Sequence, residues 1–182
     1  MNISVPLSAI GFNTINGFLI GSFIGSPTAS TNHDGLREGT QGWFYGCVVV
    51  CLVGMLGNIY SDEVLYALRR NRPPTTKTTN EHPSQRYGIP NGFLYSYPFS
   101  GIAFPNYFTE WIEWTAYALA SSALLPSSLA YINEKRISPP VLFLGLLIGV
   151  MGPRARSGEK WYRETFGKRY PKERRIVIPG LY

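Results

Sequence analysis

The sequence predicts an all-α fold, a polytopic transmembrane helical bundle, and three observations lead to that class. Apolar residues make up 45% of the 182 residues, and they gather into long runs separated by charged stretches. Two runs, Leu7–Gly25 and Trp43–Tyr60, carry no charge and approach the roughly 20 residues that cross a bilayer. The basic residues lie beside such runs, at Arg69–Arg86 and Arg154–Arg175, as they do in cytosolic loops of membrane proteins.

Two further runs bring the expected number of spans to about four. Trp111–Tyr131 is apolar apart from Glu113 and is interrupted by Pro126. Val141–Met151 is a fourth run, whose apolar core is short unless Ile137–Pro140 are included, and it fits a tilted or re-entrant segment.

Loop charge then sets the expected orientation. The basic 69–104 loop and the C-terminal tail are predicted to face the cytosol, and the weakly charged Ser26–Gln41 and Asn133–Ser138 loops to face the other side. Both termini are therefore expected in the cytosol. We expect residues 1–182 to form one membrane domain.

Three segments differ from the spans in composition. Asn71–Ser84 is rich in Pro, Thr and charge, which predicts a flexible cytosolic loop. Ile89–Phe104 is apolar and aromatic but contains two prolines and two glycines, so an irregular segment at the membrane face or around a cavity is expected. Pro153–Tyr170 combines aromatic and basic residues, a pattern that predicts an amphipathic interfacial helix.

Charge and cysteine content exclude some functions. The formal net charge is +6, but the basic residues adjoin the spans, so membrane lipids rather than nucleic acid are the expected partners. Cys47 and Cys51 are the two cysteines and lie within a predicted span. They are too few for a metal site and are interpreted as packing residues, with no metal expected.

Three polar residues at the end of the second span are candidate ligands. Asn58, Asp62 and Arg69 fall near one helical face. An amide, a carboxylate and a guanidinium on one stripe can hydrogen-bond a sugar or a base and neutralise a phosphate. The alternative is that Asp62 and Arg69 only cap and solvate a helix end.

A second group lies at the start of the third span. Asn106, Glu110 and Glu113 are spaced i, i+4, i+7, and carboxylates at membrane depth need partners. In the alternative interpretation this turn lies among the lipid headgroups, with Glu110 favoured near a helix N-terminus. Near the C-terminus, Arg154, Arg156, Lys160 and Tyr162 could hold a diphosphate or only anionic lipid heads.

Three ordered blocks carry a resemblance to a known family. They read NIYSDEVLYALRR, RYGIPNGFLYSYPFSGIAFPNYFTEWIEWTAYAL and KWYRETFGKRYPKERRIVIPGLY, with FNTING upstream. In order and spacing they resemble the C-terminal domain of the steroid 5-alpha-reductase family, the 3-oxo-5-alpha-steroid 4-dehydrogenases. The resemblance covers nearly the whole chain.

The resemblance implies a multi-pass helical bundle of the endoplasmic reticulum that binds NADPH from the cytosol. It implies an oxidoreductase acting on CH–CH groups, which reduces the conjugated C=C bond of a 3-oxo-delta4 steroid or related lipid enone. The family positions that contact the cofactor match eight residues here: Asn58, Asp62, Arg69, Tyr87, Asn106, Glu110, Arg154 and Tyr162. Gly158 stands where the family usually has a histidine, which removes one expected contact to phosphate or ribose.

A second departure is at the front of the chain. Family members have further N-terminal helices, whose Glu and Tyr bind and protonate the steroid carbonyl, and no residue before Asn2 matches them. Because loss of an acid typically costs 10²–10⁴-fold in rate, the chain is expected to be incomplete, inactive or dependent on substitutes such as Tyr95, Tyr97 or Glu113. Three alternatives stay open: a very-long-chain enoyl reductase-like protein, an isoprenylcysteine methyltransferase-like protein and a non-catalytic membrane scaffold.

Overall fold

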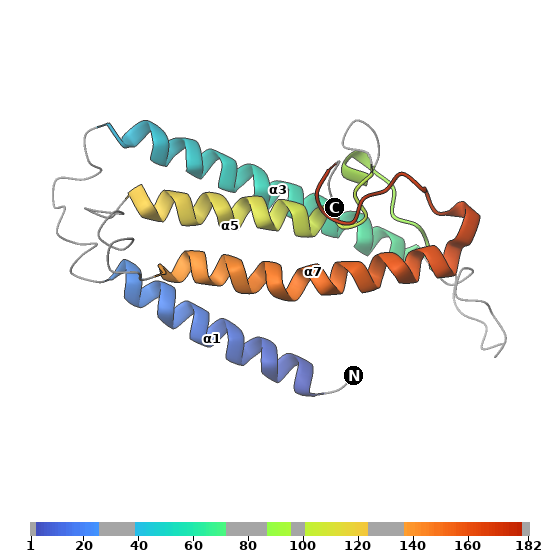
Figure 1. The fold of residues 1–182 in the computed structure, drawn as a ribbon, viewed down its shortest axis with the longest axis horizontal. Coiled ribbons are helices and arrows are strands. Elements are labelled where there is room, and N and C mark those ends of the chain that lie inside the picture. Colours follow the sequence, from blue (N-terminus) through green and yellow to red (C-terminus); the bar gives the residue numbers. More distant parts are fainter. Residues whose placement is uncertain (1–2, 26–38, 72–86, 96–100, 124–136, 180–182) are drawn as a thin grey trace. The chain divides into compact units, whose positions relative to one another are not determined.

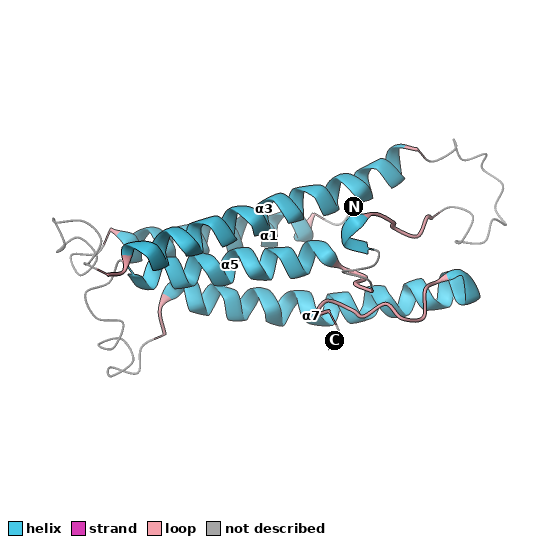
Figure 2. Cartoon of the chain, turned by 90° about the horizontal axis from the view of Figure 1, so that it is seen from above, coloured by secondary structure: helices cyan, strands magenta, loops and turns pink. Residues whose placement is uncertain are grey.

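The computed structural model describes residues 3–25, 39–71, 87–95, 101–123 and 137–179. Four long helices make up most of this part of the chain (Figure 1), namely α1 (Ser4–Ile24), α3 (Gln41–Arg70), α5 (Pro105–Ala123) and α7 (Pro139–Phe166). Two 3-10 turns, η1 (Phe93–Tyr95) and η2 (Gly167–Arg169), lie near the site described below. Figure 2 shows only helices and loops in the described ranges, where one isolated bridge joins Ile102 and Arg175. The predicted helical class is confirmed for these ranges.

Two of the described helices are long and apolar enough to cross a membrane, α3 and the continuous stretch Pro139–Arg169. Only 11% and 17% of their most apolar windows is buried inside the protein. A core helix of a soluble protein would bury most of that surface, whereas lipid solvates exposed Leu, Ile and Val side chains at no cost. The predicted number of four spans stays a prediction.

The helices follow the apolar runs closely at their starts. α3 contains the second run and α1 all of the first except Gly25, whereas α5 begins at Pro105, six residues before the third run. Proline is favoured at the first helical position because its missing N–H has no partner there. The described parts of the segment before α5, residues 89–95 and 101–104, contain no α-helix, as predicted, and Gly92 and Gly101 have positive φ. The predicted loops at 26–41, 71–84 and 133–138 lie almost wholly outside the described residues.

α7 differs from the expectation at its centre. A span ending near Met151 followed by a separate interfacial helix was expected, but one helix continues through Pro153 to Phe166. Proline removes one backbone hydrogen bond and normally bends or ends a helix. Here Ala155, one half-turn further on, is completely buried, and packing of this face favours continuation of the helix over the local preference of proline.

The chain divides into two compact units, Met1–Cys51 with Glu113–Leu147 and Leu52–Ile112 with Ile148–Tyr182. In the first unit, Phe143 of α7 packs against Phe12 of α1 and Trp114 of α5, with ring centroids 5.7 Å and 4.3 Å apart. The candidate site belongs entirely to the second unit.

In the second unit, α3 and α5 approach closely at Gly57. A Cβ atom at this position would lie 2.7 Å from Cγ2 of Thr109, so only glycine fits without movement. Two hydroxyls at the crossing bond to their own helices: Ser61 Oγ donates to the Gly57 carbonyl (2.8 Å) and Thr109 Oγ1 to the Pro105 carbonyl (2.9 Å). The crossing is therefore close, and its hydroxyls are satisfied without water.

Candidate functional site: a polar and aromatic pocket

A pocket of about 390 Å³ opens in the second unit between the C-terminal half of α3, the start of α5 and the second half of α7. Its volume lies in the range of small-molecule sites. Its walls contain charged, amide and aromatic side chains, and the residues that line it are Asp62, Leu65, Tyr66, Arg69, Tyr95, Ala103, Phe104, Asn106, Tyr107, Arg154, Gly158 and Tyr162.

The polar wall comes from three different helices. Asp62 and Arg69 stand two turns apart on α3, Asn106 lies in the first turn of α5, and Arg154 lies on α7. Two guanidinium groups suit the oxygens of phosphates, and a carboxylate suits the hydroxyls of a sugar. These are the groups that a dinucleotide requires of its binding site.

Asn106 carries an unsatisfied acceptor at this wall. Its Oδ1 atom is buried and accepts no hydrogen bond from the described residues. A buried amide oxygen without a partner costs about 1–3 kcal/mol, and such orphan atoms call for an explanation. A ligand with an N–H or O–H donor, such as a carboxamide or a ribose, would satisfy it, so the residues present fit a dinucleotide.

Aromatic side chains line the pocket as well. The ring of Phe104 stacks on Tyr107, with centroids 5.4 Å apart and an interplanar angle of 23°. The ring centre of Tyr162 lies 6.2 Å from that of Phe104. The Tyr162 ring also stacks on the rings of Tyr170 and Phe166. Stacked rings of this kind hold one another in place and present an apolar, polarisable surface.

Tyr95 forms the floor behind these rings and is 2% exposed. Its hydroxyl donates a hydrogen bond to the Ser61 carbonyl at 3.4 Å. Burial, and next the nearby Tyr162 and Asp62, raise the pKa of Tyr95 above its ordinary value, although Arg174 acts in the opposite direction. The phenol therefore keeps its proton throughout the physiological pH range.

The C-terminal tail holds two further residues of the pocket, Ala103 and Phe104, in place. Backbone bonds join it to the segment before α5, with the Ala103 N–H donating to the Arg175 carbonyl (2.8 Å) and the Phe104 N–H to the Ile176 carbonyl (3.1 Å). Gly101, at φ 105°, permits the approach because a Cβ atom there would lie 2.8 Å from the Glu173 carbonyl oxygen. The tail thus positions two residues that line the pocket.

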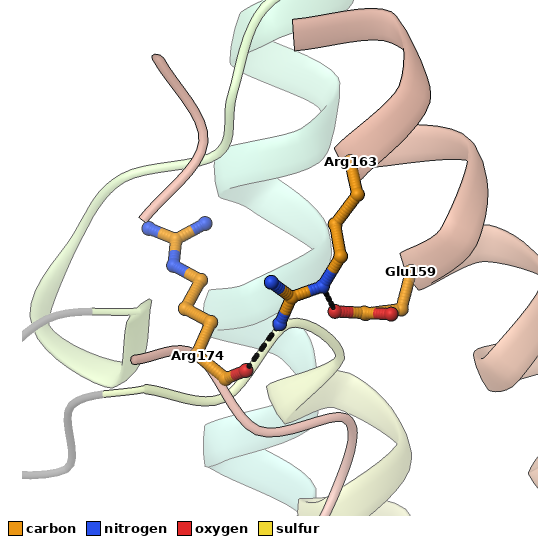
Figure 3. Close-up of polar contacts among 3 residues, drawn as sticks. All are labelled: Glu159, Arg163 and Arg174. Atoms are coloured by element: carbon orange, nitrogen blue, oxygen red, sulfur yellow. Dashed lines mark hydrogen bonds and ion pairs between the residues drawn. The ribbon is translucent and has the colours of Figure 1, made fainter. Parts of the chain in front are cut away.

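Arg174 joins the tail to the rest of the unit. It is 6% exposed, and its Nη2 donates to the Pro90 carbonyl at 2.8 Å, across 84 residues of sequence. Its guanidinium lies 5.8 Å from the ring centres of both Tyr95 and Tyr170. Figure 3 shows its backbone carbonyl accepting a hydrogen bond (3.3 Å) from Arg163, which is itself paired with Glu159.

A second, more open pocket of about 600 Å³ shares Arg69 and Tyr162 with the first. Tyr87 and Trp161 also line it, and their rings meet edge to face with centroids 5.2 Å apart.

Six of the eight residues predicted as cofactor contacts lie on these two pockets. The 390 Å³ pocket brings together Asp62, Arg69, Asn106, Arg154 and Tyr162, and Tyr87 lines its neighbour. Asn58 and Glu110 are half-buried but line neither pocket. Phe104 and Arg174 were missed, because an apolar ring and a basic tail residue carry no signal until the tail contacts that create their environment are known.

Comparison with known proteins identifies the family. A family model described as 3-oxo-5-alpha-steroid 4-dehydrogenase matches residues 1–182. The chain belongs to this family. Among its relatives, an uncharacterized protein of Schizosaccharomyces pombe is 33% identical over 100% of the chain and 58% of its own length.

Two further relatives have descriptive names. Steroid 5-alpha-reductase DET2 of Gossypium hirsutum is 30% identical over 99% of the chain and 57% of its own length. The 3-oxo-5-alpha-steroid 4-dehydrogenase 1 of Bos taurus is 35% identical over 96% and 55%. The chain spans little more than half the length of these relatives, so a reductase activity is a proposal for this chain.

Proposed function

We infer that the 390 Å³ pocket binds NADPH and that the chain is the cofactor-binding part of a membrane reductase. The observation that carries this inference is the convergence of Asp62, Arg69, Asn106 and Arg154 from three helices on one pocket. The orphan Oδ1 atom of Asn106 adds a specific need for a hydrogen-bond donor. Family membership supports the same ligand class.

The proposed reaction is reduction of the C=C bond conjugated with the ketone of a 3-oxo-delta4 steroid or related lipid enone. Bound NADPH would supply the hydride to the beta carbon, and an acid at the ketone oxygen would supply the proton. The residues of this chain bind and orient the cofactor: Arg69 and Arg154 offset phosphate charge, and Asp62 accepts hydrogen bonds from hydroxyls. Tyr162 and its stacked neighbours exclude water from part of the pocket, which strengthens the electrostatic contacts of the charged residues there.

The proposed location is the endoplasmic-reticulum membrane, with four spans and both termini in the cytosol. The two membrane-length helices and the basic residues beside the site support this placement. The site would then open on the side where NADPH is available, and the apolar substrate would arrive from the lipid.

The cofactor assignment predicts a selective loss of binding in Asn106→Ala. The substitution removes the one side-chain amide that lines the 390 Å³ pocket among the described residues, and NADPH should bind more weakly by about 1.5–3 kcal/mol, as for a hydrogen bond within a charged site. Isothermal titration of NADPH into the protein in detergent micelles measures the change.

The matched control is Asn13→Ala, the same substitution at an exposed residue of α1 in the other unit. It should leave NADPH binding unchanged. The cofactor assignment fails if wild-type protein does not bind NADPH, or if Asn106→Ala binds it as tightly as wild type does.

A further inference from the structure

The ring of Phe104 occupies the space beside Gly158 on α7. A Cβ atom at position 158 would lie 2.5 Å from Cζ and 3.2 Å from Cε1 of that ring. Separations below 3.0 Å require one partner to move. A phenyl ring at 104 and a side chain at 158 therefore exclude each other in this arrangement.

The ring is held from two further directions. Tyr107 stacks on it at 5.4 Å, and the Phe104 backbone N–H bonds to the Ile176 carbonyl of the tail. Ile102 and Ala103, directly before it, are 2% and 5% exposed, so the backbone that leads into the ring is buried. Phe104 itself is half-buried and lines the pocket.

The surroundings of the ring suit a planar heterocycle. Tyr107 and Tyr162 are its aromatic neighbours, and the guanidinium of Arg154 and the carboxylate of Asp62 line the same pocket. Aromatic side chains bind nucleotide bases by stacking, at about 1–3 kcal/mol for each ring that is removed. Sites of this kind combine such a stacking surface with positive charge for the phosphates.

We propose that Phe104 is a specificity-determining residue that gives the planar heterocycle of a dinucleotide its stacking surface, and that Gly158 is the position that admits this ring. The proposal rests on the proposed function, because it assigns a role within the same pocket. The heterocycle is either the adenine or the nicotinamide ring of the cofactor, because both are planar rings that can stack on a phenyl group.

Three substitutions test the role of the ring. Phe104→Leu keeps an apolar side chain but removes the stacking surface, so NADPH should bind roughly 5- to 150-fold more weakly, the equivalent of about 1–3 kcal/mol. Phe104→Tyr keeps the ring and should bind within about twofold of wild type. Gly158→Ala should weaken binding as Phe104→Leu does, because its new methyl group displaces the ring.

The same substitution at Gly152 is the matched control. Gly152 lies on the same helix, and a Cβ atom there would meet nothing within 4 Å. Gly152→Ala should bind NADPH as wild type does. In the double variant Phe104→Leu with Gly158→Ala, the two losses should not add, because both act on one ring.

Fragments of the cofactor distinguish the two ring sources. If Phe104 stacks on adenine, Phe104→Leu weakens binding of 2′,5′-ADP and spares nicotinamide mononucleotide; if it stacks on nicotinamide, the pattern reverses. Titration of each fragment in detergent gives the answer, with circular dichroism to check that the variants remain helical.

The outcomes separate this proposal from the cofactor assignment. Equal NADPH binding by wild type and Phe104→Leu overturns the stacking role and leaves the cofactor assignment intact. Additive losses in the double variant overturn the coupling of positions 104 and 158. Absence of NADPH binding to wild type overturns both proposals.

Discussion

Arg174 shows how one buried charge can organise residues distant in sequence. Its guanidinium contacts a carbonyl 84 residues away and two tyrosine rings, and one of these rings, Tyr95, lines the pocket. A buried charge is tolerated only where such partners offset the loss of water. The partners also fix its position, so Arg174 holds the tail and the pocket floor together.

Replacing Arg174 with Met should therefore destabilise the second unit by about 1.5–3 kcal/mol, the range for a hydrogen bond to a charged group. The pocket floor should loosen, and NADPH binding should weaken with it. Thermal unfolding in micelles and the rate of tail cleavage by a protease measure the two effects.

The neighbouring residue provides the control. The side chain of Arg175 is exposed, so Arg175→Met removes the same charge without the buried contacts and should change stability by less than about 0.5 kcal/mol. Equal destabilisation by the two variants would show that tail charge, rather than the contacts of Arg174, stabilises the unit.

The sequence predicted those pocket residues whose signal is local. Such a signal is either a regular spacing along one helix or a polar side chain that is costly to place beside a membrane span. Asp62 and Arg69 share a face because they are two turns apart, and Asn106 stood out as a polar group beside a span; all three line the pocket. Phe104 depends on contacts with the tail about 70 residues later. Such contacts leave no pattern in the local sequence, so its place in the pocket could not be predicted.

At the scale of the helices, hydropathy predicted where α1 and α3 lie but not the length of α7. Pro153 and the change from apolar to basic residues indicated a break, yet the helix continues to Phe166. Hydropathy reports the surroundings of each segment, whereas the continuity of a helix depends also on packing, here of the buried Ala155.

The α3–α5 crossing gives a prediction for these two helices. Gly57→Ala should destabilise the second unit by about 1–3 kcal/mol through overpacking, because the new methyl group would lie 2.7 Å from Cγ2 of Thr109. Thermal unfolding in micelles measures the loss. Adding Thr109→Ser, which removes that methyl group and keeps the hydroxyl, should restore most of the stability.

Gly46→Ala is the control on the same helix, because a Cβ atom there would meet nothing within 4 Å. It should leave stability unchanged or raise it by up to about 1 kcal/mol, the advantage of alanine over glycine in a helix. If Gly46→Ala and Gly57→Ala behave alike, the two helices do not depend on close contact at Gly57.

For the whole molecule, the proposed cofactor site requires one orientation in the membrane. Arg69 and Arg154 line the pocket, and the basic stretches that contain them adjoin the membrane-length helices. The positive-inside rule places such stretches in the cytosol, where NADPH is also available. The charge distribution and the proposed cofactor thus favour the same side.

A glycosylation acceptor inserted between Ser26 and Gln41 should therefore be modified in microsomes, because this weakly charged stretch is predicted to face the lumen. An acceptor inserted between Asn71 and Ser84 should stay unmodified, and tags at both termini should be open to protease added outside the microsomes. The two insertions control for each other, since each reports on one side of the membrane. Modification of the 71–84 insertion alone would place Arg69 on the lumenal side and would overturn the proposed cytosolic access of the site, whether or not the purified protein bound the nucleotide.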